Sequence, residues 1–396
     1  MVGKRIAAIA ASIVIASGVG LLVPDIFIYS KALSASSDMI PRDGNSIIVD
    51  GQVFSTTRNA SGDTWSFDAE TKTLSLSGYE GMYIDLGAQE EVTVEVSGVN
   101  KVTSNLETPA VIADGDVHVV GDGELMLYTS VCHSALCSRY GNLTITDTSV
   151  SISATGDNEN TEYLISSAGS IEILNSTITI DDQAGANGGA IGAPEDILIG
   201  ENASVDIGTN AMGIASAEGS LHVDGENTRI SIVSSNQSIY AKSGFEMTGG
   251  AVVNVVCSIE AGTAVFSPNG SVRVESSDLS VECGKTAVAG KFIVLADAYL
   301  ATPLDGEISE VSSMKTIVIG DAVAGTVEIL RGQAPTPTPS PTPTRRPVTP
   351  VPTKVNSDFL SPVVTSRMIA GAGLVVLSLI TVAVIIIRKV RSRDRY

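Results

Sequence analysis

Three side chains of different chemistry stand at equivalent positions of a repeating pattern in this 396-residue sequence. His222, Glu246 and Arg273 each lie between two apolar residues of a short alternating segment. If these segments stack as neighbouring strands, the three side chains form one outward column with a spacing of about 4.8 Å. Such a group could serve a polysaccharide lyase, with Arg273 taking or steering a proton and Glu246 opposite it. The alternative, which we favour, is a solvated ladder in which Glu246 and Arg273 pair across strands.

Two acidic segments are candidates for a cation site. GDNEN at 156–160 and DDQAGANGG at 181–189 follow the same strand position in successive repeats, so both should leave the same corner. Ca²⁺ prefers carboxylate and amide oxygens, and it is therefore the candidate cofactor. The spacing matches no established calcium loop, and solvated acidic loops are the alternative. The candidate ligands are Asp157, Asn158, Glu159, Asp181 and Asp182.

Four cysteines allow three disulfide connectivities. Cys257 and Cys283 each stand two residues beyond an inward apolar residue, and we expect them to stack on neighbouring coils. They are either a disulfide or a pair of stacked thiols. Cys132 and Cys137, in the segment CHSALC, would close a small loop.

A repeat of about 25 residues positions these side chains. Each copy begins with an apolar anchor, a second apolar residue follows two positions later, and the residue between them is polar in seven of the eight copies. Alternation of this kind predicts a strand with one dry and one wet face. The anchors are Val92, Val117, Leu143, Ile171, Ile197, Leu221, Phe245 and Val272.

Each repeat contains two further apolar sites. One is an alternating pair seven to nine residues after the anchor, and the other precedes the anchor by six or seven residues. Three short strands per repeat predict an all-β fold, a parallel β-helix, which is right-handed because parallel crossovers almost always are. Stacked antiparallel meanders or a sandwich are the alternative. The preceding sites are Val111, Leu136, Leu164, Ile191, Ile214, Ile239 and Val265.

Turn and end signals complete the solenoid. GDG at 121–123, DGEN at 224–227 and TGG at 248–250 can supply the positive φ angles of sharp corners. Because end coils expose strand edges, we expect lids at both ends. The predicted divisions are an N-terminal cap region at 36–90, repeats at 91–300 and C-terminal cap strands at 301–333. Trp65, the only tryptophan, could stack a sugar or pack within its lid.

Both termini indicate a membrane. Lys4 and Arg5 precede an apolar run, so residues 1–35 are expected to be a signal peptide or an uncleaved anchor. A Pro/Thr-rich stretch, which favours extended polyproline II, precedes twenty residues without a charge and then a basic end. The basic flanks place the repeats outside the cell membrane. The expected divisions are a stalk at 334–362, a transmembrane helix at 363–387 and a cytoplasmic tail at 388–396.

Charge limits the partners of the expected ectodomain. Residues 36–333 contain 41 Asp or Glu and 12 Lys or Arg, a net charge of −29. Such a surface repels nucleic-acid phosphates and anionic lipids, and it suits cations or neutral sugars. The low aromatic content, 4%, leaves few platforms for stacking sugars.

The run WSFDAETKTLSLSGY at 65–79, followed by coils such as GDVHVVGDGELML, resembles bacterial cell-surface parallel β-helix proteins of the carbohydrate-binding-domain-like group, a pectate-lyase-like solenoid. The resemblance covers roughly residues 60–300. It implies a secreted or membrane-anchored scaffold, some relatives of which bind acidic polysaccharide through calcium. The multi-Asp cluster with flanking Arg or Lys of the related pectate lyases does not occur here as a motif, so the resemblance does not imply catalysis.

These observations favour a noncatalytic, surface-displayed binding or adhesion protein for polysaccharide or another cell-surface ligand. A structural component of the cell envelope and a polysaccharide lyase-like enzyme are the alternatives.

Overall fold

The structure is a computed structural model that describes residues 44–105, 108–130, 134–155, 163–183, 188–258 and 262–335. Strands, turns and short irregular segments make up these ranges. Within these ranges no helix has the length and hydropathy needed to span a membrane. The predicted signal segment, transmembrane helix and basic tail lie outside them, as does the stalk beyond residue 335.

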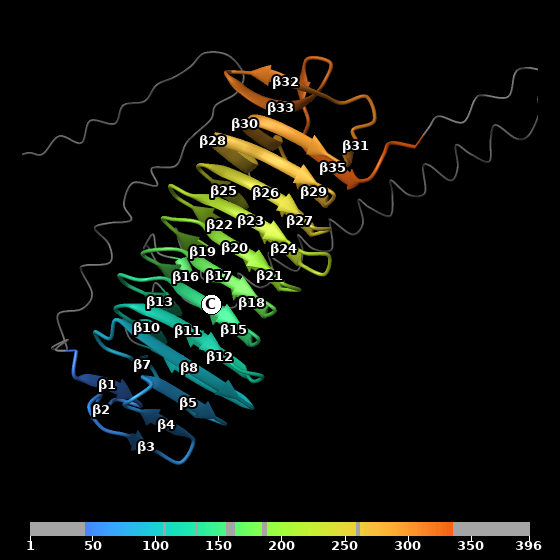
Figure 1. Cartoon of the computed structure of the whole chain (residues 1–396). Helices are drawn as coiled ribbons and strands as arrows, with labels where there is room; N and C mark the ends of the chain where they lie inside the picture. The colour runs from blue at the N-terminus through green and yellow to red at the C-terminus, as the bar shows by residue number, and fades with distance from the viewer. Residues whose placement is uncertain are drawn as a thin grey trace, which may run out of the picture. The chain divides into compact units, whose positions relative to one another are not determined.

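The described chain winds into a parallel β-solenoid, as the repeat predicts (Figure 1). Each coil supplies three strands, and each strand pairs in parallel with its equivalent in the next coil. The first strands of eight successive coils, beginning with β8, pair one after another, and we call this set the first stack. It comprises β8 (Glu91–Ser97), β11 (Asp116–Val120), β14 (Leu143–Thr146), β17 (Ile171–Leu174), β20 (Ile197–Gly200), β23 (Ser220–Asp224), β26 (Gly244–Thr248) and the end of β28 (Thr263–Glu275).

The other two strands of each coil form a second and a third stack. The second stack comprises β9 (Val99–Ser104), β12 (Glu124–Thr129), β15 (Ser149–Ala154), β18 (Thr177–Asp182), β21 (Ser204–Thr209), β24 (Arg229–Ser234), β27 (Val252–Cys257) and β29 (Asp278–Cys283). The third comprises β10 (Val111–Ala113), β13 (Leu136–Ser138), β16 (Tyr163–Ser167), β19 (Gly189–Ala193), β22 (Met212–Ser216), β25 (Ile239–Ala241) and the start of β28.

Aliphatic side chains fill the interior in register. Val119 pairs with Ile145, which pairs with Ile173, and all three side chains are fully buried. The anchors pair in the same way from coil to coil, as does the inward pair of each second strand. The expected inner ladders of the first and second stacks are therefore confirmed.

The expected ladder of the third stack is wrong at one residue. Leu136 pairs with Ile165, which then pairs with Ile191, so Ile165 takes the place that the sequence assigned to Leu164. Both side chains are buried. Because β16 is buried along its whole length, hydropathy does not alternate there and cannot choose between neighbours.

Corners take left-handed backbone where the sequence placed glycine. Gly121, Gly225, Gly249 and Gly250 all have positive φ angles. A Cβ on Gly121 would collide with the carbonyl of Val96 in the preceding coil. Glycine is therefore required at this corner both by φ and by the close approach of two coils.

Parallel stacking begins earlier than the alternating repeats. β5 (Thr73–Ser77), β6 (Glu80–Met82) and β7 (Ile84–Asp85) pair in parallel with β8, β9 and β10. Antiparallel pairings cover the free edges of β7 and β5: β1 (Ser46–Val49) pairs with β2 (Gln52–Ser55) and with β7, and β4 (Trp65–Asp68) pairs with β3 (Ala60–Ser61) and with β5. This arrangement covers two of the three strand edges at the N-terminal end.

Antiparallel strands also end the stack at the other side. β30 (Thr286–Ala296) is the last parallel strand, and β33 (Met314–Ile319) pairs with it in the opposite direction. β35 (Thr326–Arg331) lies antiparallel between β29 and β31 (Ala298–Thr302). β32 (Glu307–Val311) and β34 (Ala322–Val323) flank β33. The sequence predicts C-terminal cap strands at 301–333.

Replacement of Ile145 by Ala should lower the free energy of unfolding by about 2–4 kcal/mol, because it leaves a cavity between Val119 and Ile173. The matched control is Thr144→Ala, one residue away on the outer face, which should change stability by about 0.5 kcal/mol or less. Urea denaturation measures both. Equal effects of the two substitutions would contradict the inward ladder.

Tyr79 makes the N-terminal end sensitive to alkaline pH. Its hydroxyl donates to the Met82 carbonyl (3.1 Å), and burial, with the nearby Asp50 charge second, raises the pKa of Tyr79 to about 12. Between about pH 10 and pH 12 the unfolded chain has lost the Tyr79 proton that the folded chain keeps, so the free energy of unfolding falls as pH rises. Tyr79→Phe removes this contribution.

We expect the wild-type chain to lose roughly 2 kcal/mol more stability than Tyr79→Phe from pH 9.5 to pH 12. Urea denaturation at a series of pH values measures the difference between the two proteins. If their stabilities fall in parallel, Tyr79 is not protected in the folded state.

Candidate functional site

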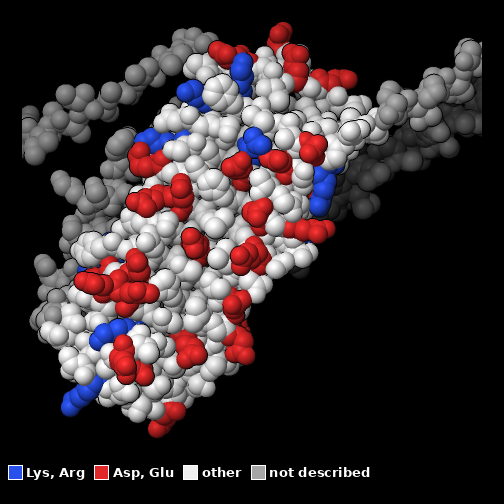
Figure 2. Space-filling model, in the orientation of Figure 1, with Lys and Arg blue, Asp and Glu red and all other residues white. Residues whose placement is uncertain are grey.

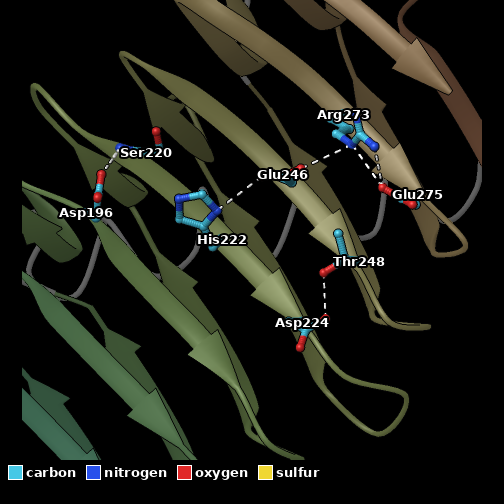
Figure 3. Close-up of polar contacts among 8 residues, drawn as sticks. All are labelled: Asp196, Ser220, His222, Asp224, Glu246, Thr248, Arg273 and Glu275. Carbon is cyan, nitrogen blue, oxygen red and sulfur yellow. Dashed lines mark hydrogen bonds and ion pairs between the residues drawn. The ribbon is translucent and has the colours of Figure 1, made fainter. Parts of the chain in front are cut away.

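His222, Glu246 and Arg273 form the column that the repeat predicts. His222 on β23 pairs with Glu246 on β26, and Glu246 pairs with Arg273 on β28. Their side chains point outward from three successive strands, and each contacts its neighbour (Figure 3). His222 Nδ1 lies 3.4 Å from Glu246 Oε2, and Arg273 Nε lies 3.1 Å from Glu246 Oε1.

A fourth residue, Glu275, adds an ion pair to this column. We call His222, Glu246, Arg273 and Glu275 together the ion ladder. Its Oε2 lies 2.5 Å from Arg273 Nη2 and accepts a hydrogen bond from Arg273 Nε at 3.0 Å. Glu275 stands two residues after Arg273 on the same strand and therefore on the same face. The alternation of side chains along this strand could have identified Glu275 from the sequence. A comparison of equivalent positions between repeats does not identify it.

The ion ladder is solvated and holds Arg273 as a cation. The side chains of His222, Glu246, Arg273 and Glu275 are each 37–42% exposed. The hydrogen bond to Glu275 and the charge of Glu275 raise the pKa of Arg273, and Glu246 adds to the effect. A guanidinium that stays protonated does not accept a proton, so this geometry does not favour Arg273 as a general base.

Polar side chains also join coils beside the ion ladder. Asp196 Oδ1 accepts the Ser220 backbone N–H at 2.7 Å, and Thr248 donates to Asp224 at 2.5 Å (Figure 3). Acidic side chains are scattered over the face seen in Figure 2, with fewer basic ones among them. This face combines exposed carboxylates with cross-coil hydrogen bonds.

The two described residues of the predicted calcium site point in opposite directions. Asp181 is exposed and accepts a hydrogen bond from Gln183 Nε2 at 2.5 Å. Asp182, the next residue of β18, is buried and accepts one from Thr209 Oγ1 at 2.7 Å. Asp157, Asn158 and Glu159 lie outside the described residues. Within the described ranges no three His, Cys, Asp or Glu side chains could hold a metal ion, and the calcium site stays a prediction.

A groove of about 270 Å³ lies beside Asp181 and crosses four coils. Asp181, Gly208, Val233 and Val256 occupy one outward column of the second stack. A Cβ on Gly208 would meet only the Ile180 carbonyl, at 3.9 Å, so this position is open. The remaining lining residues are Asp182, Gln183, Thr209, Asn210, Ser234, Ser235 and Ser258.

The groove was not predicted from the sequence. Val233 is 54% exposed and Val256 is 47% exposed, although neighbouring outward positions are mostly polar. Two apolar residues and a glycine in one outward column were the signal available. Asn210 and Ser235 each stand two residues after a member of this column, and only the stacking of coils combines them with it into one groove.

Trp65 packs within the N-terminal cap. Its ring meets Phe54 edge-on, with centroids 4.8 Å apart, and it lies against Gly62 so closely that a Cβ there would collide with it. Trp65 also lies partly buried against the core. These contacts correspond to the packing alternative for this residue.

The cysteines are placed as follows. Cys257 and Cys283 are direct partners on β27 and β29, which confirms that they stack, and both are thiols. Cys137 is buried on β13, and Cys132 lies outside the described residues.

No family model matches the chain, and searches of curated proteins and of solved structures find no match to it. The parallel β-solenoid is therefore established by the structure itself. The resemblance to the carbohydrate-binding-domain-like group stays a prediction from the sequence.

Loss of the central carboxylate of the ion ladder should change the stability of the protein only slightly. We expect Glu246→Gln to lower the melting temperature by less than about 2 °C in dilute buffer, because exposed ion pairs contribute little. The difference should disappear in 1 M NaCl, where such pairs are screened. Thermal unfolding at both salt concentrations measures this. A large loss that persists in salt would show a structural role beyond a surface ion pair.

Proposed function

We propose that this protein is a noncatalytic β-solenoid that binds polysaccharide, with the groove beside Asp181 as a contact site. The observation that supports this most directly is the composition of the groove. Exposed Val233 and Val256 supply an apolar surface, and Asp181 and Asn210 supply oxygen and nitrogen atoms that can hydrogen-bond to hydroxyl groups. A sugar ring has both kinds of surface, apolar C–H groups and hydroxyls.

The size of the groove favours one or two units of a longer chain. Its volume of about 270 Å³ is just below the range of roughly 300–1,000 Å³ that is typical of small-molecule pockets. It crosses β18, β21, β24 and β27, so an extended polymer could continue over neighbouring coils. A rigid repeat surface suits a polymeric ligand better than an isolated small molecule.

Charge favours a neutral or cationic polysaccharide. Asp181 and Asp182 line the groove, and none of its described lining residues is Lys or Arg. An anionic polymer would also meet the general excess of acidic residues in the expected ectodomain. The proposed ligand therefore lacks a high density of negative charge.

Display at the cell surface is the second part of the proposal, and the sequence alone supports it. The Pro/Thr-rich stretch at 334–362 is proposed to hold the solenoid away from a helix at 363–387 in the cell membrane. Adhesion to a polysaccharide-coated surface would follow from this placement.

Gly208→Leu tests the groove. An added side chain should fill the groove without backbone strain, because Gly208 lies in an extended strand and has open space outside it. We expect at least a tenfold loss of affinity for the glycan that the wild-type chain selects from an array of neutral, cationic and anionic polysaccharides. The matched control is Ser204→Leu, on the outward face of the same strand but outside the groove, which should bind as the wild type does.

Three outcomes would contradict the proposal. Equal binding by the wild type and Gly208→Leu would remove the groove as the contact site. Release of oligosaccharides from a bound polymer would show that the protein is an enzyme, and a failure of the wild type to bind any glycan would favour a structural envelope role.

A further inference from the structure

A buried column of small, mostly polar side chains follows the last inward aliphatic residue of each second strand. These side chains lie where the strand turns toward the next one, and in several coils they hydrogen-bond to backbone groups of the turn. Ser234 donates to the Asn236 carbonyl at 2.8 Å, and Thr209 accepts the Ala211 N–H at 3.0 Å. The members are Ser104, Thr129, Ala154, Asp182, Thr209, Ser234, Cys257 and Cys283.

The last two members of this column are thiols. Cys257 Sγ donates to the Asn236 carbonyl at 3.0 Å, the same acceptor that Ser234 uses. Cys257 and Cys283 are direct partners in adjacent parallel strands, and they are only 4% and 8% exposed. Neighbouring strands lie about 4.8 Å apart, within the Cα separation of roughly 4.4–6.8 Å that a disulfide requires.

The two sulfur atoms differ in their surroundings. Cys283 interacts with the Cys257 side chain and with backbone groups of Lys285, Thr286 and Ala264, and together these outweigh burial and lower the pKa of Cys283. Backbone N–H groups that surround a sulfur stabilise the thiolate, which is the form that attacks disulfides. Cys257 donates its thiol proton to the Asn236 carbonyl and is the less exposed of the two, so Cys283 is the nucleophile of the pair.

We propose that Cys257 and Cys283 form a reversible disulfide that clamps β27 to β29, with a small-molecule disulfide as oxidant. The Cys283 thiolate attacks one sulfur of the oxidant, a mixed disulfide forms, and the other half leaves as a thiolate. Cys257 then loses its proton to solvent, attacks the Cys283 sulfur and displaces the second half. The protein dithiol is oxidised by two electrons, and the oxidant is reduced to two thiols.

The clamp would act at the C-terminal end of the solenoid. β29 is the last parallel strand of the second stack, and β35 of the C-terminal cap pairs with its other edge. A bond between β27 and β29 would close a loop spanning one coil and restrict the unfolded chain. It would therefore oppose separation of the last two coils, next to the C-terminal cap. This inference is independent of the proposed polysaccharide binding.

The test uses the full-length chain, equilibrated either with oxidised glutathione or with a reductant, then denatured, alkylated and digested. The expected product of oxidation is a peptide pair linked through Cys257 and Cys283, lighter by two hydrogens than its parts. The melting temperature should be higher by roughly 5 °C or more in the oxidised protein. Full alkylation of both cysteines after oxidation would overturn the proposal.

Serine variants separate the roles of the two thiols. Serine fits this column, since Ser234 occupies the equivalent place two coils before Cys283. Cys257→Ser should accumulate a glutathione adduct on Cys283, and Cys283→Ser should form an adduct on Cys257 at least tenfold more slowly. Equal rates would overturn the assignment of Cys283 as the nucleophile. Cys137→Ser, on another strand, is the matched control and should keep both the linked peptide and the rise in melting temperature.

Discussion

The in-register stacking of aliphatic side chains inside the coils determines the rest of this structure. Val119, Ile145 and Ile173 are partners in three consecutive first strands and are closed to solvent. Because side chains alternate across a strand, fixing the inward residues also fixes every outward residue between them. A slip of one residue would turn the apolar set outward, so burial specifies the register strongly. The columns on the surface are a consequence of the core.

The outer columns are therefore free to vary in chemistry at little cost to stability. The ion ladder of His222, Glu246, Arg273 and Glu275 lies in water, where ion pairs contribute little. The groove arises in another outward column because Gly208 leaves a gap beside two exposed valines. In a solenoid of this kind, a site can form where an outer column departs from its usual polarity and size. This separation of core and surface supports a binding role for the scaffold.

The corners and ends impose a different constraint, because the backbone turns away from its ladder partners there. Small polar side chains next to the core, such as Ser234 and Thr209, supply hydrogen bonds to these turns. Cys257 likewise donates a hydrogen bond to a turn carbonyl, that of Asn236, and its thiol lies opposite Cys283. At the ends of the stack, antiparallel strands pair with edges that would otherwise be open. The need for small side chains at this turn thus brings together two thiols, which can react with each other.

Hydropathy with a period of two, repeated at equivalent positions, defines the register of the strands. It was therefore enough to predict the parallel β-solenoid, the inner ladders of two stacks, the column of His222, Glu246 and Arg273 and the stacking of Cys257 on Cys283. Tertiary structure alone decided that Ile165 rather than Leu164 joins the third ladder, since a strand buried on both faces carries no alternation. It also decided which groups of different coils meet: Asp182 accepts a hydrogen bond from Thr209, and a groove forms beside Gly208. These features depend on contacts between side chains and turns of different coils, and such contacts have no fixed spacing along the chain.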